Sequence, residues 1–144
     1  MKLLPILFAV VVPFAACSKS GTETVTPQKH SDEPMDHGHG AHHELASVTI
    51  GAHTLQVARE GDVKAGAEAA FDLSVEKGKP LPAMVRCWIG VESGEGSMKA
   101  KFSKENDTTV HGHVEVPKTI PAGAKLWIEI EEAGKTARGA VAYQ

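Results

Sequence analysis

The sequence is 144 residues long and carries 15 basic and 18 acidic side chains, which gives a net charge of -3 at pH 7 with neutral histidines. No cluster of Lys and Arg stands out, and this argues against nucleic acid as a partner. Two cysteines are too few for a disulfide framework, so a hydrophobic core of modest size must stabilise the fold.

The first 16 residues have the pattern of a secretory signal. Lys2 is followed by an uncharged apolar run from Leu3 to Phe14 and then by two alanines. Such a run is too short to cross a bilayer core of roughly 30 Å as a helix. We therefore expect residues 1–16 to be a signal peptide that is removed from the mature protein.

The sequence Ala15-Ala16-Cys17 resembles the lipobox of bacterial lipoproteins. The resemblance implies that diacylglycerol alkylates the Cys17 thiol, that the signal is cut before Cys17, and that the new amino terminus is acylated. Several acyl chains, at about 0.8 kcal/mol for each buried CH₂, give a stable bilayer anchor. The resemblance thus implies a location in the cell envelope, facing the periplasm or the exterior, and Ser18 after the cysteine implies, by analogy with this family, the outer membrane in a host with two membranes. The alternative is an ordinary cleaved signal with an incidental Cys17.

Residues 17–45 are predicted to form a disordered, histidine-rich tether. The segment 18–44 has no hydrophobic periodicity and is rich in Ser, Thr, Pro, Gly, Asp, Glu and His. This composition cannot bury enough apolar surface to offset the entropy of ordering. A random coil of this length reaches roughly 30 Å, which would hold a domain just off the lipid surface.

Five of the eight histidines lie within this tether, between residues 30 and 44. They are His30, His37, His39, His42 and His43. Imidazole is a good ligand for Zn, Cu and Ni ions, and the neighbouring carboxylates add oxygen donors. The irregular spacing predicts a flexible, adaptable metal site. The alternative is a solvated spacer whose histidines are only compositional.

Residues 46–144 are expected to form the folded domain. From residue 46 the sequence changes to short runs of alternating apolar and polar residues that are broken by Gly and Pro. The runs are 48–50 and 54–57, which flank a predicted hairpin turn at 51–52, then 68–76, 84–91, 97–103, 108–116, 125–131 and, less regularly, 136–143. No window predicts an amphipathic helix. The pattern indicates an all-β, antiparallel, immunoglobulin-like β-sandwich of about seven strands.

The run 108–116 carries a second group of candidate metal ligands. Residues i and i+2 of a strand share a face, so His111, His113 and Glu115 are expected to project together, away from the buried valines. Two imidazoles on one face can reach the same ion. Glu115, His53 or a tether histidine could supply a third ligand. The alternative is that these side chains only form the solvated face of a strand.

Four further residues are assigned to packing. Cys87 alternates with apolar residues and is predicted to be a small buried hydrophobe. Trp88 and Trp127 lie opposite the main apolar face of their strands. We expect them to form a second packing layer, with an exposed binding platform as the alternative. Gly112, on the apolar side of its strand, indicates a bulge or a close backbone approach.

Residues 68–116 resemble the YtkA-like group of exported β-sandwich domains and, more loosely, periplasmic copper-handling sandwiches. The shared features are a strand, a Lys-Gly-Lys-Pro turn at 77–80, a second apolar strand and a His-Gly-His strand that ends at Val116-Pro117. The resemblance implies an immunoglobulin-like fold. For the copper relatives, it also implies metal binding through His111 and His113.

No catalytic motif is present, so the sequence predicts a non-enzyme without an organic cofactor. The leading hypothesis is a membrane-anchored lipoprotein that binds or buffers a divalent transition metal, Zn, Cu or Ni, through its histidine-rich segment. The β-domain would share or receive the ion through His111 and His113. The alternative is a structural or protein-interaction module of the envelope, in which the histidine-rich stretch is only a spacer.

Overall fold

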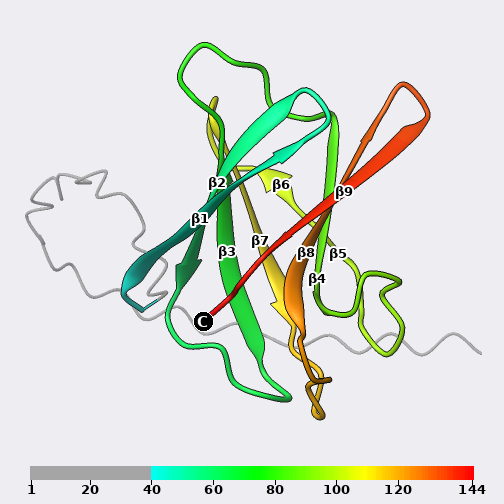
Figure 1. Cartoon of the computed structure of the whole chain (residues 1–144). Coiled ribbons are helices and arrows are strands. Elements are labelled where there is room, and N and C mark those ends of the chain that lie inside the picture. The colour runs from blue at the N-terminus through cyan, green and yellow to red at the C-terminus, as the bar shows by residue number, and fades with distance from the viewer. Residues whose placement is uncertain (1–39) are drawn as a thin grey trace, which may run out of the picture. The chain divides into compact units, whose positions relative to one another are not determined.

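The computed structural model describes residues 40–144, which form an antiparallel β-sandwich (Figure 1). Its strands are β1 (His42–Ile50), β2 (His53–Glu60), β3 (Glu68–Ser74), β4 (Met84–Gly90), β5 (Ala100–Lys101), β6 (Ser103–Lys104), β7 (Thr109–Glu115), β8 (Lys125–Glu132) and β9 (Lys135–Val141). One sheet has the order β1-β2-β3-β7-β6 and the other the order β5-β4-β8-β9. The predicted all-β sandwich is confirmed. Within residues 40–144 no helix has the length and apolar character needed to span a membrane.

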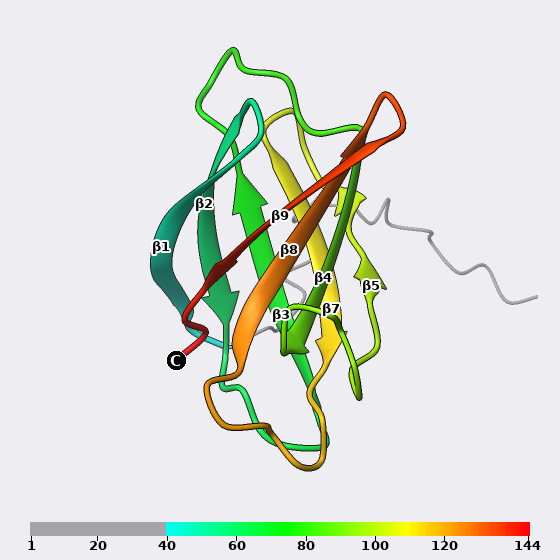
Figure 2. The same cartoon turned by 45° about the vertical axis from the view of Figure 1, so that its right-hand side comes forward.

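The strand order is that of an immunoglobulin sandwich with two edge strands added, β1 in one sheet and β5 in the other. In such domains strands A, B, E and D form one sheet, and strands C, F and G form the other. Strands β2, β3, β7 and β6 take the first four places, while β4, β8 and β9 take the other three. Strand β1 is an extra edge strand that pairs with β2 through a tight hairpin. Figure 2 shows the two sheets facing each other as layers.

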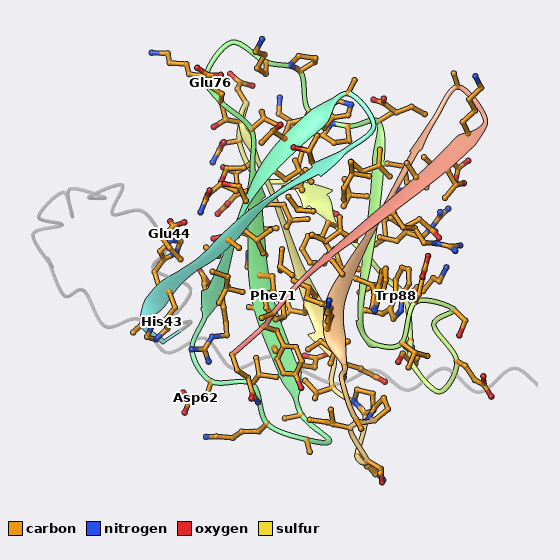
Figure 3. All side chains as sticks on the ribbon, in the orientation of Figure 1. His43, Glu44, Asp62, Phe71, Glu76 and Trp88 are labelled. Carbon is orange, nitrogen blue, oxygen red and sulfur yellow. The ribbon has the colours of Figure 1, made fainter. Side chains whose placement is uncertain are left out.

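The core lies between the two sheets and consists of the alternating apolar residues that the sequence predicted. Phe71 and Leu73 of β3 and Ile128 of β8 are fully buried in one hydrophobic cluster, and Phe71 lies near its centre in Figure 3. Cys87 belongs to the same cluster, and its burial raises the pKa of its thiol well above the ordinary value. Because each sheet uses one face for the core, its other face can carry polar side chains.

Strand β1 reaches further toward the N-terminus than the predicted domain boundary at residue 46. Its first residue, His42, pairs with Glu60, and His43 pairs with Arg59. The pairing uses backbone groups, while the side chains of His42, His43 and Glu44 are exposed, so no apolar alternation marks this end of the strand. Residues 42–45 therefore belong to the sandwich and not to the predicted tether.

Several predictions concern residues 1–39, which lie outside the part of the chain that the structure describes. These are the signal peptide 1–16, the lipidation of Cys17 and the tether histidines His30, His37 and His39. They stay predictions from the sequence.

The run 97–103 differs from the single strand that its alternation predicted. It enters two short strands, β5 and β6, which pair with β4 and β7 in different sheets. Phe102, between them, is buried and its amide donates to the carbonyl of Val85 at 3.0 Å. By alternation, Met98 is expected on the same face as Phe102. It is nevertheless 62% exposed, because the chain joins the sheet only at Ala100.

The two tryptophans form a second packing layer on the outer face of the four-stranded sheet, as the sequence predicted. Trp88, which Figure 3 labels, is fully buried, and its ring stacks on that of Trp127 with centroids 6.4 Å apart. The ammonium of Lys99 lies 4.4 Å from the centroid of the Trp88 ring. Trp88 is thus covered by Trp127 and Lys99 and offers no exposed platform.

Candidate metal centre

The outer face of the five-stranded sheet gathers imidazole and carboxylate side chains from four strands. One row of paired residues across β1, β2, β3 and β7 is His42, Glu60, Ala70 and His113, and the next row is Glu44, Ala58, Asp72 and His111. Directly paired residues project to the same side of a sheet. We call the surface formed by five of these side chains the histidine face: His42, Glu60, Asp72, His111 and His113.

Two alanines at the centre of these rows let the longer side chains approach one another. Ala58 and Ala70 lie on the outer face by register, yet they are only 4% and 6% exposed. Neither is part of the hydrophobic core cluster. Their burial indicates that neighbouring side chains fold over them. The histidine face is therefore a packed polar layer and not a set of separate solvated side chains.

His111 and His113 point their Nε2 atoms toward each other at a distance of 3.3 Å. Their rings are nearly perpendicular, with an interplanar angle of 78°. Two nitrogens bound to one tetrahedral ion at 2.0–2.1 Å lie about 3.3 Å apart. The two Nε2 atoms therefore already have the separation of two ligands on a single ion. The predicted common face of His111 and His113 is confirmed.

Asp72 fixes the orientation of the His111 ring. The Nδ1 of His111 lies 2.7 Å from Oδ1 of Asp72, and the two side chains are only 22% and 14% exposed. When Nδ1–H donates to the carboxylate, the Nε2 lone pair of His111 faces His113. Histidines that bind metals commonly donate their other N–H to a carboxylate in this way, which holds the ring and raises its basicity.

Two groups of three side chains in the described part of the chain lie close enough to hold a metal ion. One is Asp72, Glu105 and His111, and the other is His42, Glu60 and Asp72. Within each group, one ligand atom from every residue lies within 4.8 Å of the others. Asp72 is common to both groups. Glu60, Asp72 and Glu105 were not predicted from the sequence, because only the strand order brings them beside the histidines.

His42 is held over this face by its neighbour on the same strand. Its Nε2 lies 3.0 Å from Oε1 of Glu44, and Gln56 donates to the other oxygen of Glu44 at 2.9 Å. The hydrogen bond with Glu44 raises the pKa of His42, and the same bond lowers the pKa of Glu44. Because a metal needs the unprotonated imidazole, protons compete with metal ions at His42.

The remaining predicted ligands lie elsewhere. His43 follows His42 directly and so projects from the other side of β1, at the strand start that Figure 3 labels. His53 is buried, with its Nε2 2.9 Å from Oε1 of Glu132. Among the described residues, His43, His53 and also His113 lie outside the two groups of three side chains that are close enough to hold an ion.

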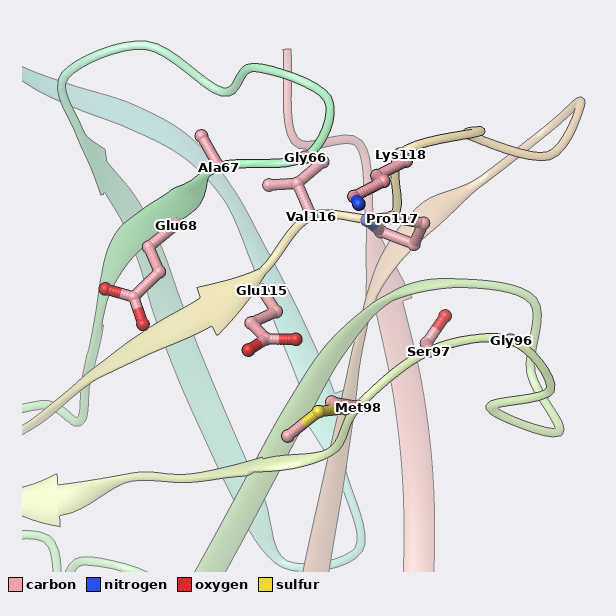
Figure 4. A pocket seen from close by; sticks show the side chains of 10 residues that line it. All are labelled: Gly66, Ala67, Glu68, Gly96, Ser97, Met98, Glu115, Val116, Pro117 and Lys118. Carbon is pink, nitrogen blue, oxygen red and sulfur yellow. The ribbon is translucent and has the colours of Figure 1, made fainter.

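Glu115 also lies outside the two groups. It follows His113 on the same face and lines a surface pocket of about 500 Å³ beside Glu68, Met98 and Lys118 (Figure 4). Its strand partner is Glu68, which places two carboxylates directly opposite each other. Glu115 shares the face of His111 and His113, as the sequence predicted, while Asp72 and Glu105 are the carboxylates that lie near His111.

Gly112 lies between the two histidines on β7, where the ring of Phe102 packs against the strand. A Cβ atom at this position would lie 2.3 Å from Cδ1 of Phe102, so the phenyl ring packs directly on the strand. The register between β3 and β7 runs without a break from Glu68 to Ser74, so Gly112 is not in a bulge. The sequence predicted a bulge or a close backbone approach at Gly112, whereas the structure shows an aromatic side chain packed against it.

Comparison of the chain with family models, with curated proteins and with solved structures gave no match. The resemblance to YtkA-like domains stays an expectation from the sequence.

Proposed function

We propose that the protein is a lipid-anchored, extracytoplasmic protein that binds a divalent transition metal ion on its histidine face. The observation that carries the proposal is the 3.3 Å separation between the Nε2 atoms of His111 and His113. The bilayer anchor and the location outside the cytoplasm rest on the Ala-Ala-Cys17 pattern of the sequence.

His111 and His113 would bind the ion through Nε2. Asp72 would orient His111 through Nδ1, and the carboxylate of Glu105, which lies near Asp72 and His111, would be a third ligand. A pair of imidazoles with one carboxylate suits Zn, Cu and Ni ions. The ligands lie on an open sheet face, where an ion can enter and leave, which fits a protein that captures or buffers metal.

The tether histidines would assist this capture. His39 precedes His42 by three residues, so the predicted tether leads directly to the face. A ligand on a short linker is present at a high effective concentration near the site to which it is joined. Ions held weakly by His30, His37 and His39 would thus be passed to the more ordered ligands of the sheet.

The test is a titration of the purified full-length chain with Zn²⁺ by calorimetry, without an affinity tag. Comparison with the double variant H111A/H113A should show a loss of at least tenfold in the affinity of the tightest site. The control is His43→Ala, which removes an imidazole from the other side of β1 and should leave that affinity unchanged. Equal affinity in the wild type and in H111A/H113A would contradict the proposal.

A further inference from the structure

A second set of potential ligands lies beside the first on the histidine face. His42, Glu60 and Asp72 come from β1, β2 and β3, three neighbouring strands, and their ligand atoms lie within 4.8 Å of one another. His42 is exposed, while Glu60 and Asp72 are half-buried. The residues are distant in the sequence, so their convergence is a product of the fold and not of a local run of acidic residues.

Asp72 can serve both sets at once. Its Oδ1 accepts the Nδ1–H of His111 at 2.7 Å, and a carboxylate has about four lone-pair positions on its two oxygens. One carboxylate can therefore orient His111 and also contact an ion on the side of β1 and β2. The two sets are adjacent positions on one face that share Asp72.

We propose that His42, Glu60 and Asp72 bind a second divalent ion next to the one at His111 and His113. The inference rests on the proposed function, because Asp72 takes part in both positions. With one imidazole and two carboxylates, the second position is richer in oxygen than the first. Oxygen-rich sites suit harder ions such as Mn²⁺, whereas an imidazole pair suits Cu²⁺, Ni²⁺ and Zn²⁺.

Four carboxylates on or beside the histidine face can balance the charge of bound cations, those of Glu44, Glu60, Asp72 and Glu105. His42 and Glu60 are also directly paired, as the first residue of β1 and the last residue of β2. An ion between them would fasten the open end of the β1–β2 hairpin to β3.

The experiment counts bound ions in the full-length chain after removal of the tether histidines by H30A/H37A/H39A. Metal-free protein is dialysed against excess Zn²⁺, and bound zinc is measured by mass spectrometry of the metal. We expect two zinc ions per chain in this variant and one after the further change His42→Ala. His43→Ala, on the same strand but the other face, should retain two. The change H111A/H113A should leave one.

Mn²⁺ separates the two positions by their chemistry. In electron paramagnetic resonance titrations, Mn²⁺ should bind the H30A/H37A/H39A variant. Adding H111A/H113A to this variant should leave its affinity for Mn²⁺ unchanged. His42→Ala or Glu60→Gln should weaken Mn²⁺ binding at least tenfold. The substituted side chains lie outside the core, and circular dichroism checks that each variant is folded.

The result that would contradict the second ion position differs from the result that would contradict the proposed function. A single zinc ion that His42→Ala leaves in place would refute the second position but not the first. Loss of both zinc ions in His42→Ala would also refute the second position, because both ions would then depend on one shared site. Zinc binding that H111A/H113A leaves unchanged would refute the proposed function.

Discussion

Asp72 and His111 are 39 residues apart in the chain, yet a hydrogen bond of 2.7 Å joins Oδ1 of the carboxylate to Nδ1 of the imidazole. The bond exists because β3 and β7 are paired and Asp72 lies directly opposite His111. It directs the Nε2 of His111 toward His113. The proposed binding of an ion on this face therefore depends on a carboxylate that orients one of the ligands.

Asp72→Asn should weaken Zn²⁺ binding by about 10–100-fold, the usual effect of removing a carboxylate that orients a metal-binding histidine. An amide oxygen can still accept the hydrogen bond, but it carries no charge to strengthen the imidazole as a ligand. The measurement is a competition titration with a coloured chelator. Asp62→Asn is the control, because it removes the same charge from an exposed loop residue after β2. Similar affinities in the two variants would speak against the orienting role.

Zinc should raise the melting temperature of the sandwich. A ligand that binds only the folded state at 100 times its Kd adds about 2.7 kcal/mol to the free energy of unfolding, which is several degrees for a domain of this size. Metal held only by the predicted tether would leave the melting temperature unmoved. Differential scanning calorimetry with and without Zn²⁺ distinguishes the two cases. The shift should become smaller in H111A/H113A, which keeps only the ion position at His42, Glu60 and Asp72, and an undiminished shift in this variant would contradict binding at His111 and His113.

Gly112→Ala should destabilise the fold by roughly 1–3 kcal/mol, because the new methyl group would overlap the ring of Phe102. Urea unfolding measures the loss. Phe102→Leu should relieve part of it, so that the double variant is more stable than the sum of the two single changes predicts. Strict additivity of the two changes would show that the ring does not restrict position 112.

Acid should remove the stabilising effect of Glu129. This carboxylate is 5% exposed and contacts Lys99, Arg138 and Arg86, and the hydrogen bond from Lys99 is the main cause of its lowered pKa. Because the folded pKa lies below the unfolded value near 4.5, the ionised group stabilises the fold above that value. This stabilisation is lost as the pH falls through the folded pKa.

Glu129→Gln should therefore reduce the free energy of unfolding at pH 7 by roughly 1–3 kcal/mol, since it leaves three cations without their shared partner. The difference from the wild type should begin to shrink below about pH 4.5, and it should be lost as the pH falls through the lower pKa of the folded carboxylate. Urea unfolding at a series of pH values measures this. A difference that stays constant down to pH 3 would contradict the assignment.

Much of the sandwich could be predicted from alternation, because a strand with one buried face shows a period of two. The run 108–116 correctly placed His111 and His113 together, since that inference needs only one strand. The start of β1 at His42 could not be predicted, because its pairing is made by backbone groups. The division of run 97–103 into β5 and β6 could not be predicted either. Phe102 continues the alternation, although the chain passes from one sheet to the other at this point.

The partners of the histidines could not be found from the sequence for a related reason. The alternation of 68–76 puts Asp72 on the polar side of its strand, but it does not reveal which strand lies beside it. Glu60 and Glu105 likewise reach the face only through strand order and loop geometry. A pattern within one strand predicts which residues share a face, whereas the composition of a site across strands is set by topology.

The most direct test of the central claim is the state of the two imidazoles in long-range ¹H–¹⁵N spectra of the histidines during a Zn²⁺ titration. We predict that His111 and His113 bind zinc through Nε2 and that Nδ1 of His111 stays protonated toward Asp72. Histidine signals that do not change with saturating zinc, or coordination of His111 through Nδ1, would contradict the claim.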